Sequence, residues 1–436
     1  MFSTDRSGAE TWECVARSNP QAQILQAMKG MKTLRSGRTG RNRRKWIYVL
    51  LFMGLLGLSG CGSPSSASTE TSSEATSEVT QAAETTQEEQ TELVKTGSME
   101  LQYAENFAVD YYEDGYKMLT TLPDSKRYLL VPEGQPVPRG LDEDVSILQE
   151  PLQNIYLVAS GVMDMFVSLD AVGQIRFSGQ KQENWYIQTA KDAMEAGDMI
   201  YAGKYSKPDY ELLVSEGCDL AIENRMITHS PEVVEMLQSF DIPVMIEYSS
   251  YEQHPLGKVE WVKFFGALTG KEAEAEEAFA EQTEILEEVE SGEKTGKTIA
   301  FFYVTSNGLI QVRQSTDYIP KLIELAGGRY IFEDLEDSGS GRSTLNMQVE
   351  DFYAGAKDAD ILIYNSSIDG GVTTLDELID KCNILKDFKA LQEGQVYCTT
   401  NDMYQQSMAI GYLLQDMHTV LTDDDTAKLR YLFLLQ

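Results

Sequence analysis

Histidine and cysteine are scarce in this sequence, which has three histidines and five cysteines in 436 residues. His229, His254 and His418 form no His-rich loop, and such a loop is typical of receptors that bind bare Zn²⁺ or Mn²⁺. No CxxC pair occurs, which disfavours a zinc site of cysteine ligands. Cys14 and Cys61 belong to the N-terminal leader described below, and the odd remainder argues against a disulfide framework. We expect Cys218, Cys382 and Cys398 to be small buried side chains, and Cys382 with Cys398 is the only pairing to check.

Catalytic signatures are missing as well. The sequence has neither a G-x-S-x-G nucleophile elbow nor an H-E-x-x-H zinc motif. The segment from Gly292 to Thr298 resembles a phosphate-binding loop, but it has three residues between its glycines where four are required, and it precedes a strand. We therefore expect no enzyme and no cofactor. A hydrolase that uses paired carboxylates stays open as an alternative, because nothing singles out a pair among so many acids.

Basic residues are too few to balance the acids: 36 Lys and Arg face 69 Asp and Glu, a net charge of −33. Residues 1–60 hold ten basic and three acidic side chains, so the remainder carries −40. A field of this sign repels nucleic acid and anionic lipid headgroups, which excludes both as partners. An anionic ligand would need a local basic patch.

The sequence also lacks a long apolar run. Trp46 to Leu58 is about 13 residues, whereas a spanning helix needs about 20. This run follows Arg-Asn-Arg-Arg-Lys at 41–45 and ends in Leu58-Ser59-Gly60-Cys61. A basic stretch, a short apolar stretch and small residues predict a secretory signal over residues 1–60. The last four residues match the bacterial lipobox, so we predict lipidation at Cys61 and export to the outer face of the cytoplasmic membrane. The start at Met1, Met28 or Met31 stays open.

Residues 61–97 are rich in Ser, Thr, Glu, Gln and Ala and have almost no bulky apolar side chains. Such a segment buries too little surface to fold, so we predict a flexible tether behind the lipidated cysteine. The rest of the chain, from residue 98, is too long for one simple core and predicts two domains.

Short β-rich runs alternate with helical patterns along this body, which predicts an α/β fold with mostly parallel sheets. The predicted strands are 127–131, 154–158, 174–177, 199–202, 219–223 and 243–247, then 297–304, 309–313, 329–332, 360–364 and 395–399. The predicted helices are 160–171, 184–195, 208–216 and 231–239, then 317–326, 349–358, 374–380, 384–392 and 403–420. Between the two series, residues 271–291 form an acidic helix with an apolar stripe. We therefore predict a first lobe at 98–270, an interlobe helix at 271–291 and a second lobe at 292–436, with a ligand cleft between the lobes.

Several segments resemble the substrate-binding proteins of ABC importers for iron siderophores and cobalamin. Gly203, Pro208, Glu211 and Asp219 fit the motif G…P-x-x-E…D-L-(V/A)-I, and Ile323 to Gly328 fits I-x-x-A-G-G. Glu350, Ala359-Asp360 and the segment from Leu385 to Tyr397 fit later motifs of the same family, in the same order. The resemblance covers residues 120–420.

This resemblance implies a monomer that binds a ferric siderophore, haem or cobalamin between its lobes and delivers it to a permease and its ATPase. By position in the motifs, Glu211 and Glu350 would be the carboxylates that pair with permease arginines. Membrane contact would run only through the lipid. Direct capture of Zn²⁺ or Mn²⁺ stays open as the alternative within ABC receptors.

Ligands of α/β clefts bind at loops that follow the carboxyl ends of strands. Aromatic walls with a few arginines suit a large, flat, partly anionic ligand. That rule selects Trp185, Tyr186, Tyr201, Tyr205, Arg225, Tyr248, Tyr251 and His254 in the first lobe, and Tyr303, Asn307, Arg313, Arg342, Asn365 and Tyr404 in the second. We give most weight to Arg225 and Arg313, because an arginine in an inward loop of an acidic protein needs a partner.

Overall fold

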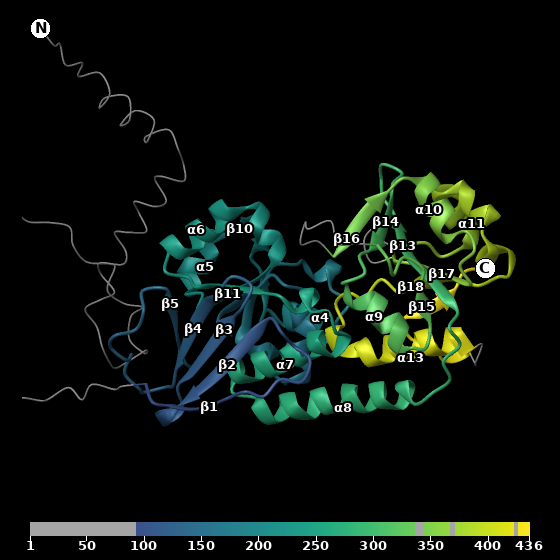
Figure 1. The fold of residues 1–436 in the computed structure, drawn as a ribbon. Helices are drawn as coiled ribbons and strands as arrows, with labels where there is room; N and C mark the ends of the chain where they lie inside the picture. Colours follow the sequence, from purple (N-terminus) through teal and green to yellow (C-terminus); the bar gives the residue numbers. More distant parts are fainter. Residues whose placement is uncertain (1–92, 336–342, 367–370, 423–425) are drawn as a thin grey trace, which may run out of the picture. The chain divides into compact units, whose positions relative to one another are not determined.

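The computed structural model describes residues 93–335, 343–366, 371–422 and 426–436. The signal segment, the lipobox with Cys61, nearly all of the tether and Arg342 lie outside these residues, so those predictions stay predictions. None of the helices in the described ranges is both long and apolar enough to span a bilayer. The described body contains two α/β lobes, which confirms the predicted fold class (Figure 1). The lobe boundaries at 98–270, 271–291 and 292–436 stay predictions.

The first lobe contains a five-stranded parallel sheet in the order β12-β11-β6-β7-β8. Its strands are β6 (Ile155–Leu157), β7 (Ile175–Ser178), β8 (Ile200–Tyr201), β11 (Leu220–Asn224) and β12 (Val244–Glu247). Its helices are α3 (Val162–Ser168), α4 (Gln188–Ala196), α5 (Tyr210–Glu216) and α6 (Pro231–Ser239). Side chains alternate across the sheet, so Ala221 packs with α5 and α6 while Leu220 and Ile222 pack with the main core.

Gly203 begins a small hairpin of β9 (Gly203–Lys204) and β10 (Lys207–Pro208), which leads into α5. Its φ is +89°, and a Cβ at this position would lie 2.3 Å from the carbonyl oxygen of Lys207. Only glycine fits both the dihedral and the close approach. A local steric requirement therefore accounts for glycine at position 203 of the motif.

A second sheet in the first lobe was mostly missed by the prediction, which had only its fourth strand. It consists of β1 (Lys95–Ser98), β2 (Phe107–Tyr112), β3 (Lys117–Thr121), β4 (Lys126–Val131) and β5 (Val145–Gln149) in sequential order. All pairs are antiparallel except β4 with β5. Asp114 (φ 57°) and Gly115 (φ 84°) form the turn before β3, and an Asp-Gly pair between alternating strands is a hairpin signal.

Helix α7 (Pro255–Thr269) was also missed. It is buried along its whole length from Pro255 to Leu268. A helix that is covered on every side shows no apolar stripe, so periodicity does not reveal it. Its Glu260 accepts hydrogen bonds from the backbone N–H groups of Gln102, Tyr103 and Ala104 (2.8–3.1 Å), which fixes the segment before β2.

Helix α8 (Glu272–Glu290) follows, and it matches the predicted interlobe helix. It packs against α7 and α3 of the first lobe and against α13 (Ile410–Thr422) and α9 (Tyr318–Leu325) of the second (Figure 1). One apolar cluster runs through these helices and includes residues of both lobes, such as Trp261 and Leu413. The lobes are therefore joined by a continuous core at the helices.

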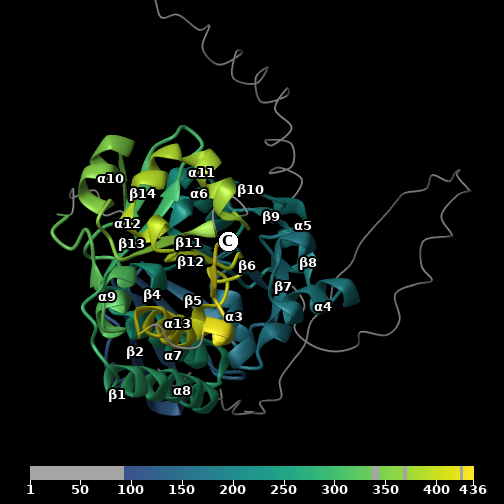
Figure 2. The same ribbon diagram turned by 90° about the vertical axis from the view of Figure 1, so that its right-hand side faces the viewer.

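The second lobe has a seven-stranded mixed sheet in the order β16-β14-β13-β17-β18-β19, with β15 beside β13. Its strands are β13 (Thr298–Val304), β14 (Ile310–Arg313), β15 (Arg329–Tyr330), β16 (Thr344–Met347), β17 (Ile361–Tyr364), β18 (Val396–Thr399) and β19 (Leu432–Leu434). The other helices are α10 (Val349–Ala356), α11 (Leu375–Lys381) and α12 (Lys389–Gln392). These cover one face of β13, and α9 and α13 cover the other (Figure 2). Cys218, Cys382 and Cys398 are free thiols.

Candidate ligand-binding site

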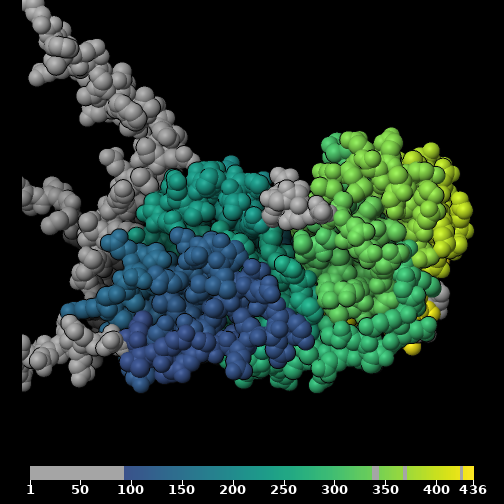
Figure 3. Space-filling view, in the orientation of Figure 1, coloured from purple at the N-terminus to yellow at the C-terminus, as the bar shows by residue number. Residues whose placement is uncertain are grey.

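Two adjoining cavities lie between the lobes, with volumes of about 520 and 280 Å³. Arg225, Ser250 and Tyr251 of the first lobe and Ser343 of the second line both of them. The space-filling view shows the teal part of the first lobe beside the green part of the second (Figure 3). The predicted cleft is therefore present.

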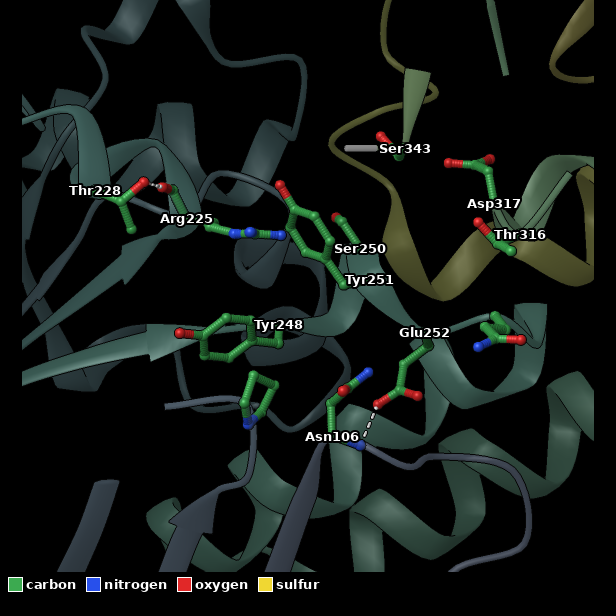
Figure 4. A pocket seen from close by; sticks show the side chains of 12 residues that line it. Asn106, Arg225, Thr228, Tyr248, Ser250, Tyr251, Glu252, Thr316, Asp317 and Ser343 are labelled. Atoms are coloured by element: carbon green, nitrogen blue, oxygen red, sulfur yellow. Dashed lines mark hydrogen bonds between the residues drawn. The ribbon is translucent and has the colours of Figure 1, made fainter. Parts of the chain in front are cut away.

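The first-lobe wall follows the carboxyl ends of β11 and β12, as predicted. Asn224 ends β11, and its side chain accepts a hydrogen bond from the N–H of Met226 (2.8 Å), which starts a 3₁₀ turn at Arg225. The Arg225 guanidinium lies 4.6 Å from the centroid of the Tyr251 ring, a cation–π contact. Tyr248 contacts Tyr251 edge-on, with centroids 6.4 Å apart, and Figure 4 shows the three side chains along one wall. Burial and the nearby Asp124 raise the pKa of Tyr248.

The opposite wall comes from the start of α9. Asp317 caps this helix by accepting a hydrogen bond from the N–H of Ile319 (2.9 Å). Its other carboxylate oxygen lies 3.4 Å from the Arg313 guanidinium. Thr316 and Asp317 face the larger cavity together with Ser343 (Figure 4). Arg313, Tyr318, Met403 and Tyr404 line the smaller cavity.

Two buried charged residues also line the smaller cavity, and neither was predicted. The Glu247 carboxylate accepts a hydrogen bond from the N–H of Ser249 (2.9 Å). Burial raises the pKa of Glu247, and the bonds from Ser249 and the charge of Lys258 oppose that rise. Lys258 of α7 is 6% exposed, and its ammonium lies 4.8 Å from the centroid of the Tyr318 ring. Lys258 lies on a mostly apolar helix that also contains Glu260 and Lys263, so its sequence context does not distinguish it as a cavity residue.

Glu252, on the rim of the larger cavity, was also missed. It accepts hydrogen bonds from the backbone N–H groups of Glu105 (2.9 Å) and Asn106 (3.0 Å) and from the Trp261 indole (2.8 Å). Burial raises the pKa of Glu252, and these bonds oppose the rise. The residue thus holds the segment before β2 against the cavity wall.

Four predicted ligand residues line neither cavity. Trp185 is buried in the core, where its indole N–H donates to Ser178 (3.1 Å). Tyr205 packs against the apolar cluster under α5 and α6. His254 caps α7 by accepting from the N–H of Leu256 (3.2 Å), and it stacks on Tyr103. Tyr303 is buried on β13. In each case a core contact or a helix cap accounts for the side chain.

Among the remaining candidates, some line a cavity and others do not. Tyr186, Tyr201, Asn307 and Asn365 line neither cavity. Tyr404 does, and its ring meets that of Tyr186 edge-on at 6.4 Å. Tyr303 lies within β13, Asn307 follows β13 and Asn365 follows β17, whereas the second-lobe wall of the larger cavity includes Thr316 and Asp317 at the start of α9. Arg313 reaches the cavity from β14, which runs antiparallel to β13.

Glu211 and Glu350 lie away from the cavities, and both side chains are exposed. Each is in the first turn of a helix, α5 in the first lobe and α10 in the second. The two motif carboxylates thus have corresponding local positions in the two lobes.

Within the described ranges, no group of three or more His, Cys, Asp and Glu side chains is placed to hold a metal ion. Two of the histidines have structural contacts, since His254 caps α7 and a ring nitrogen of His418 lies 2.9 Å from the carbonyl oxygen of Ala326. The Zn²⁺ or Mn²⁺ alternative gains no supporting geometry from these residues.

No family model matches the sequence. Among curated proteins, the chain is 24% identical over 351 residues to an uncharacterized lipoprotein of Methanocaldococcus jannaschii, which covers 74% of this chain and 81% of that protein. A second uncharacterized lipoprotein of the same organism is 24% identical over 343 residues, covering 74% and 83%.

Solved structures with a similar arrangement include a possible iron-binding periplasmic solute-binding protein of Staphylococcus epidermidis, with a TM-score of 0.49 at 17% identity. That likeness covers 62% of this chain and 98% of the other. A periplasmic haem-binding protein of Vibrio cholerae gives a TM-score of 0.49 at 14% identity, covering 61% and 98%.

Proposed function

We propose that this protein is an extracytoplasmic solute-binding lipoprotein that captures a metal chelate (a ferric siderophore or haem) or cobalamin and delivers it to an ABC importer. The observation that carries the proposal is the pair of cavities between two α/β lobes, lined by Arg225, Tyr251 and Arg313. Together these cavities have the size of a drug-sized ligand site, which is about 300–1,000 Å³. Their aromatic and guanidinium walls suit a flat ligand with anionic groups.

The anchoring part of the proposal rests on the N-terminus. Leu58-Ser59-Gly60-Cys61 matches a lipobox, and the two relatives from M. jannaschii carry the name lipoprotein. A lipidated Cys61 followed by a tether would hold the lobes on the outer face of the membrane, within reach of a permease.

Glu211 and Glu350 are the proposed docking residues. Both are exposed, so a salt bridge to a permease arginine contributes about 0–1 kcal/mol and allows release. One carboxylate lies on each lobe, so the permease would read the relative placement of the lobes through the two bridges. This reading explains why a receptor would have a matched pair of weak contacts.

Ligand capture is tested by a thermal-shift panel of cyanocobalamin, haemin, several ferric siderophores, Zn²⁺ and Mn²⁺. We expect a raised melting temperature with one class of complex and no change with the bare ions. A shift that occurs only with Zn²⁺ or Mn²⁺, and that a chelator reverses, would replace the proposal with direct metal capture.

Delivery is tested separately with the double variant Glu211→Ala and Glu350→Ala. We expect transport of the ligand to be abolished while its affinity for the purified protein is unchanged. The matched control is Glu235→Ala with Glu393→Ala, which removes one other exposed carboxylate from each lobe. Equal transport by the two double variants, or lost affinity in the first, would show that docking occurs elsewhere.

A further inference from the structure

Three cationic side chains converge on the smaller cavity: Arg225, Lys258 and Arg313. Glu247 is the only acidic residue among those that line it. This is a local reversal of charge in a protein whose net charge is −33. Such a reversal is what an anionic ligand requires of an acidic receptor.

Lys258 differs from Arg313 in forming no ion pair. Arg313 lies 3.4 Å from Asp317, and Arg225 stacks on Tyr251. Within the described ranges Lys258 forms no ion pair and no hydrogen bond through its ammonium, and its one close contact is the Tyr318 ring. The side chain is nevertheless only 6% exposed.

Lys263, on the same helix, shows how the chain treats a buried lysine that has a structural role. It is 4% exposed, and its ammonium lies 3.0 Å from Glu276 and 3.6 Å from Glu260. A buried charge is normally paired in this way, because desolvation without a partner is unfavourable. Lys258 departs from that pattern at the point where its helix meets the cavity.

The acids near Lys258 already accept hydrogen bonds from other groups. Glu247 accepts from Ser249, Asp317 from the N–H of Ile319, and Asp164 from the N–H of Met408 (2.8 Å). The charge of Lys258 still acts on all three, since it lowers the pKa of each against the effect of burial. None of them, however, lies within ion-pairing distance of its ammonium.

We propose that Lys258 is the anion-binding residue of the cleft and that the solute is therefore an anion with a flat, conjugated body. An oxyanion of the solute, either a carboxylate or a deprotonated chelating oxygen, would bind the Lys258 ammonium in the smaller cavity. Tyr251 and Tyr404 offer aromatic surface to the flat part, and the larger cavity holds the remainder. This inference rests on the proposed function and narrows its ligand class.

The binding experiment uses pairs of probes that differ in charge. Protoporphyrin IX is compared with its dimethyl ester, which lacks the free carboxylates, and a ferric tris-catecholate is compared with cationic ferrioxamine B. Cyanocobalamin serves as the probe without a carboxylate. Affinities are measured by quenching of tryptophan fluorescence for the wild type, Lys258→Met, Lys258→Arg and the control Lys321→Met, which removes a charge that pairs with Glu324 outside both cavities.

We expect one anionic probe to bind the wild type and to bind Lys258→Met about 10- to 100-fold more weakly, the usual loss for a hydrogen bond to a charged group. Lys258→Arg should restore most of the affinity, and Lys321→Met should match the wild type. The pair of probes whose anionic member binds shows whether the ligand presents a carboxylate or a catecholate. Unchanged affinity in Lys258→Met, equal losses in the Arg and Met variants, or a wild-type preference for the uncharged or cationic probe would overturn the inference and leave the proposed function standing. If no probe in the panel binds the wild type, the proposed function itself is contradicted.

A stability measurement separates a binding role from a structural one. Methionine has a similar shape to the lysine stem and brings no buried charge. We expect Lys258→Met without ligand to unfold at a higher temperature than the wild type. A lower unfolding temperature would show that the ammonium stabilises the fold, and it would overturn the assignment.

Discussion

Replacing Glu223 with glutamine removes a titratable group from the apolar interior of the first lobe. Glu223 is 0% exposed on β11, on the same face as Ala221, and neither carboxylate oxygen has a hydrogen-bond partner among the described residues. Burial raises the pKa of this carboxyl from 4.5 to about 8. The folded protein therefore keeps Glu223 protonated at neutral pH, whereas the unfolded chain ionises it.

The direction in which stability changes with pH follows from the number of protons bound in the folded and the unfolded state. Between pH 4.5 and about 8 the folded state holds the proton and the unfolded state has lost it, so stability falls as the pH rises. One pKa unit corresponds to about 1.4 kcal/mol. At pH 7 the wild type should therefore lose about 3 kcal/mol of unfolding free energy relative to a side chain that does not ionise. Below pH 4.5 this difference should vanish.

The assay is urea unfolding followed by tryptophan fluorescence across this pH range. We expect the stability of Glu223→Gln to exceed that of the wild type by an amount that grows with pH. Glu235→Gln, which removes an exposed carboxylate from α6, controls for net charge. Wild-type and Glu223→Gln curves that run parallel from pH 5 to 8 would refute the reasoning.

Two further predictions concern the segment before β2 and the anchor. Glu260→Gln should lower the unfolding free energy by about 3 kcal/mol, because an amide replaces a buried carboxylate that accepts from three backbone N–H groups. Urea unfolding measures this loss, and a change below about 1 kcal/mol would mean that the segment is held by other contacts. Cys61→Ser should abolish labelling of the protein with a fatty acid, since the thiol that would carry the lipid is gone. Labelling of the variant would contradict the lipobox assignment.

The sequence predicts the first-lobe wall well and the second-lobe wall poorly, for a physical reason. Arg225, Tyr248 and Tyr251 follow parallel strands, whose carboxyl ends meet at one edge of the sheet. In the second lobe β14 and β16 run antiparallel to their neighbours, so strand ends do not mark one edge. The mixed directions cannot be read from the hydrophobic pattern of the strands, because each is buried or alternating whichever way it runs.

For the single residues Lys258 and Trp185, too, the sequence does not show whether the side chain lines the cleft or packs in the core. The sequence predicts Trp185 at the rim of the cleft, at the start of a helix, but a large aromatic ring packs equally well in a core, and its indole N–H donates to Ser178. Lys258 was overlooked because its helix lacks an apolar stripe. The helix also contains Glu260 and Lys263, and the sequence does not show that Lys263 pairs with Glu260 and Glu276 while Lys258 lines the cavity without an ion pair.

The charge distribution also predicts an unusual dependence on salt. An anionic solute approaches through the field of a protein with a net charge of −33 and then meets Lys258, whose side chain is only 6% exposed, in the smaller cavity. Salt screens the long-range repulsion, whose range is about 8 Å at physiological ionic strength, and it screens the buried contact much less. The association rate of the anionic probe should therefore rise with ionic strength, the opposite of a steered encounter, while its dissociation rate changes little. Stopped-flow fluorescence at low and high salt measures both rates. An association rate of this anionic probe that falls with salt would contradict the prediction, because it would mean that the local positive charge of the cleft outweighs the net negative charge during the approach.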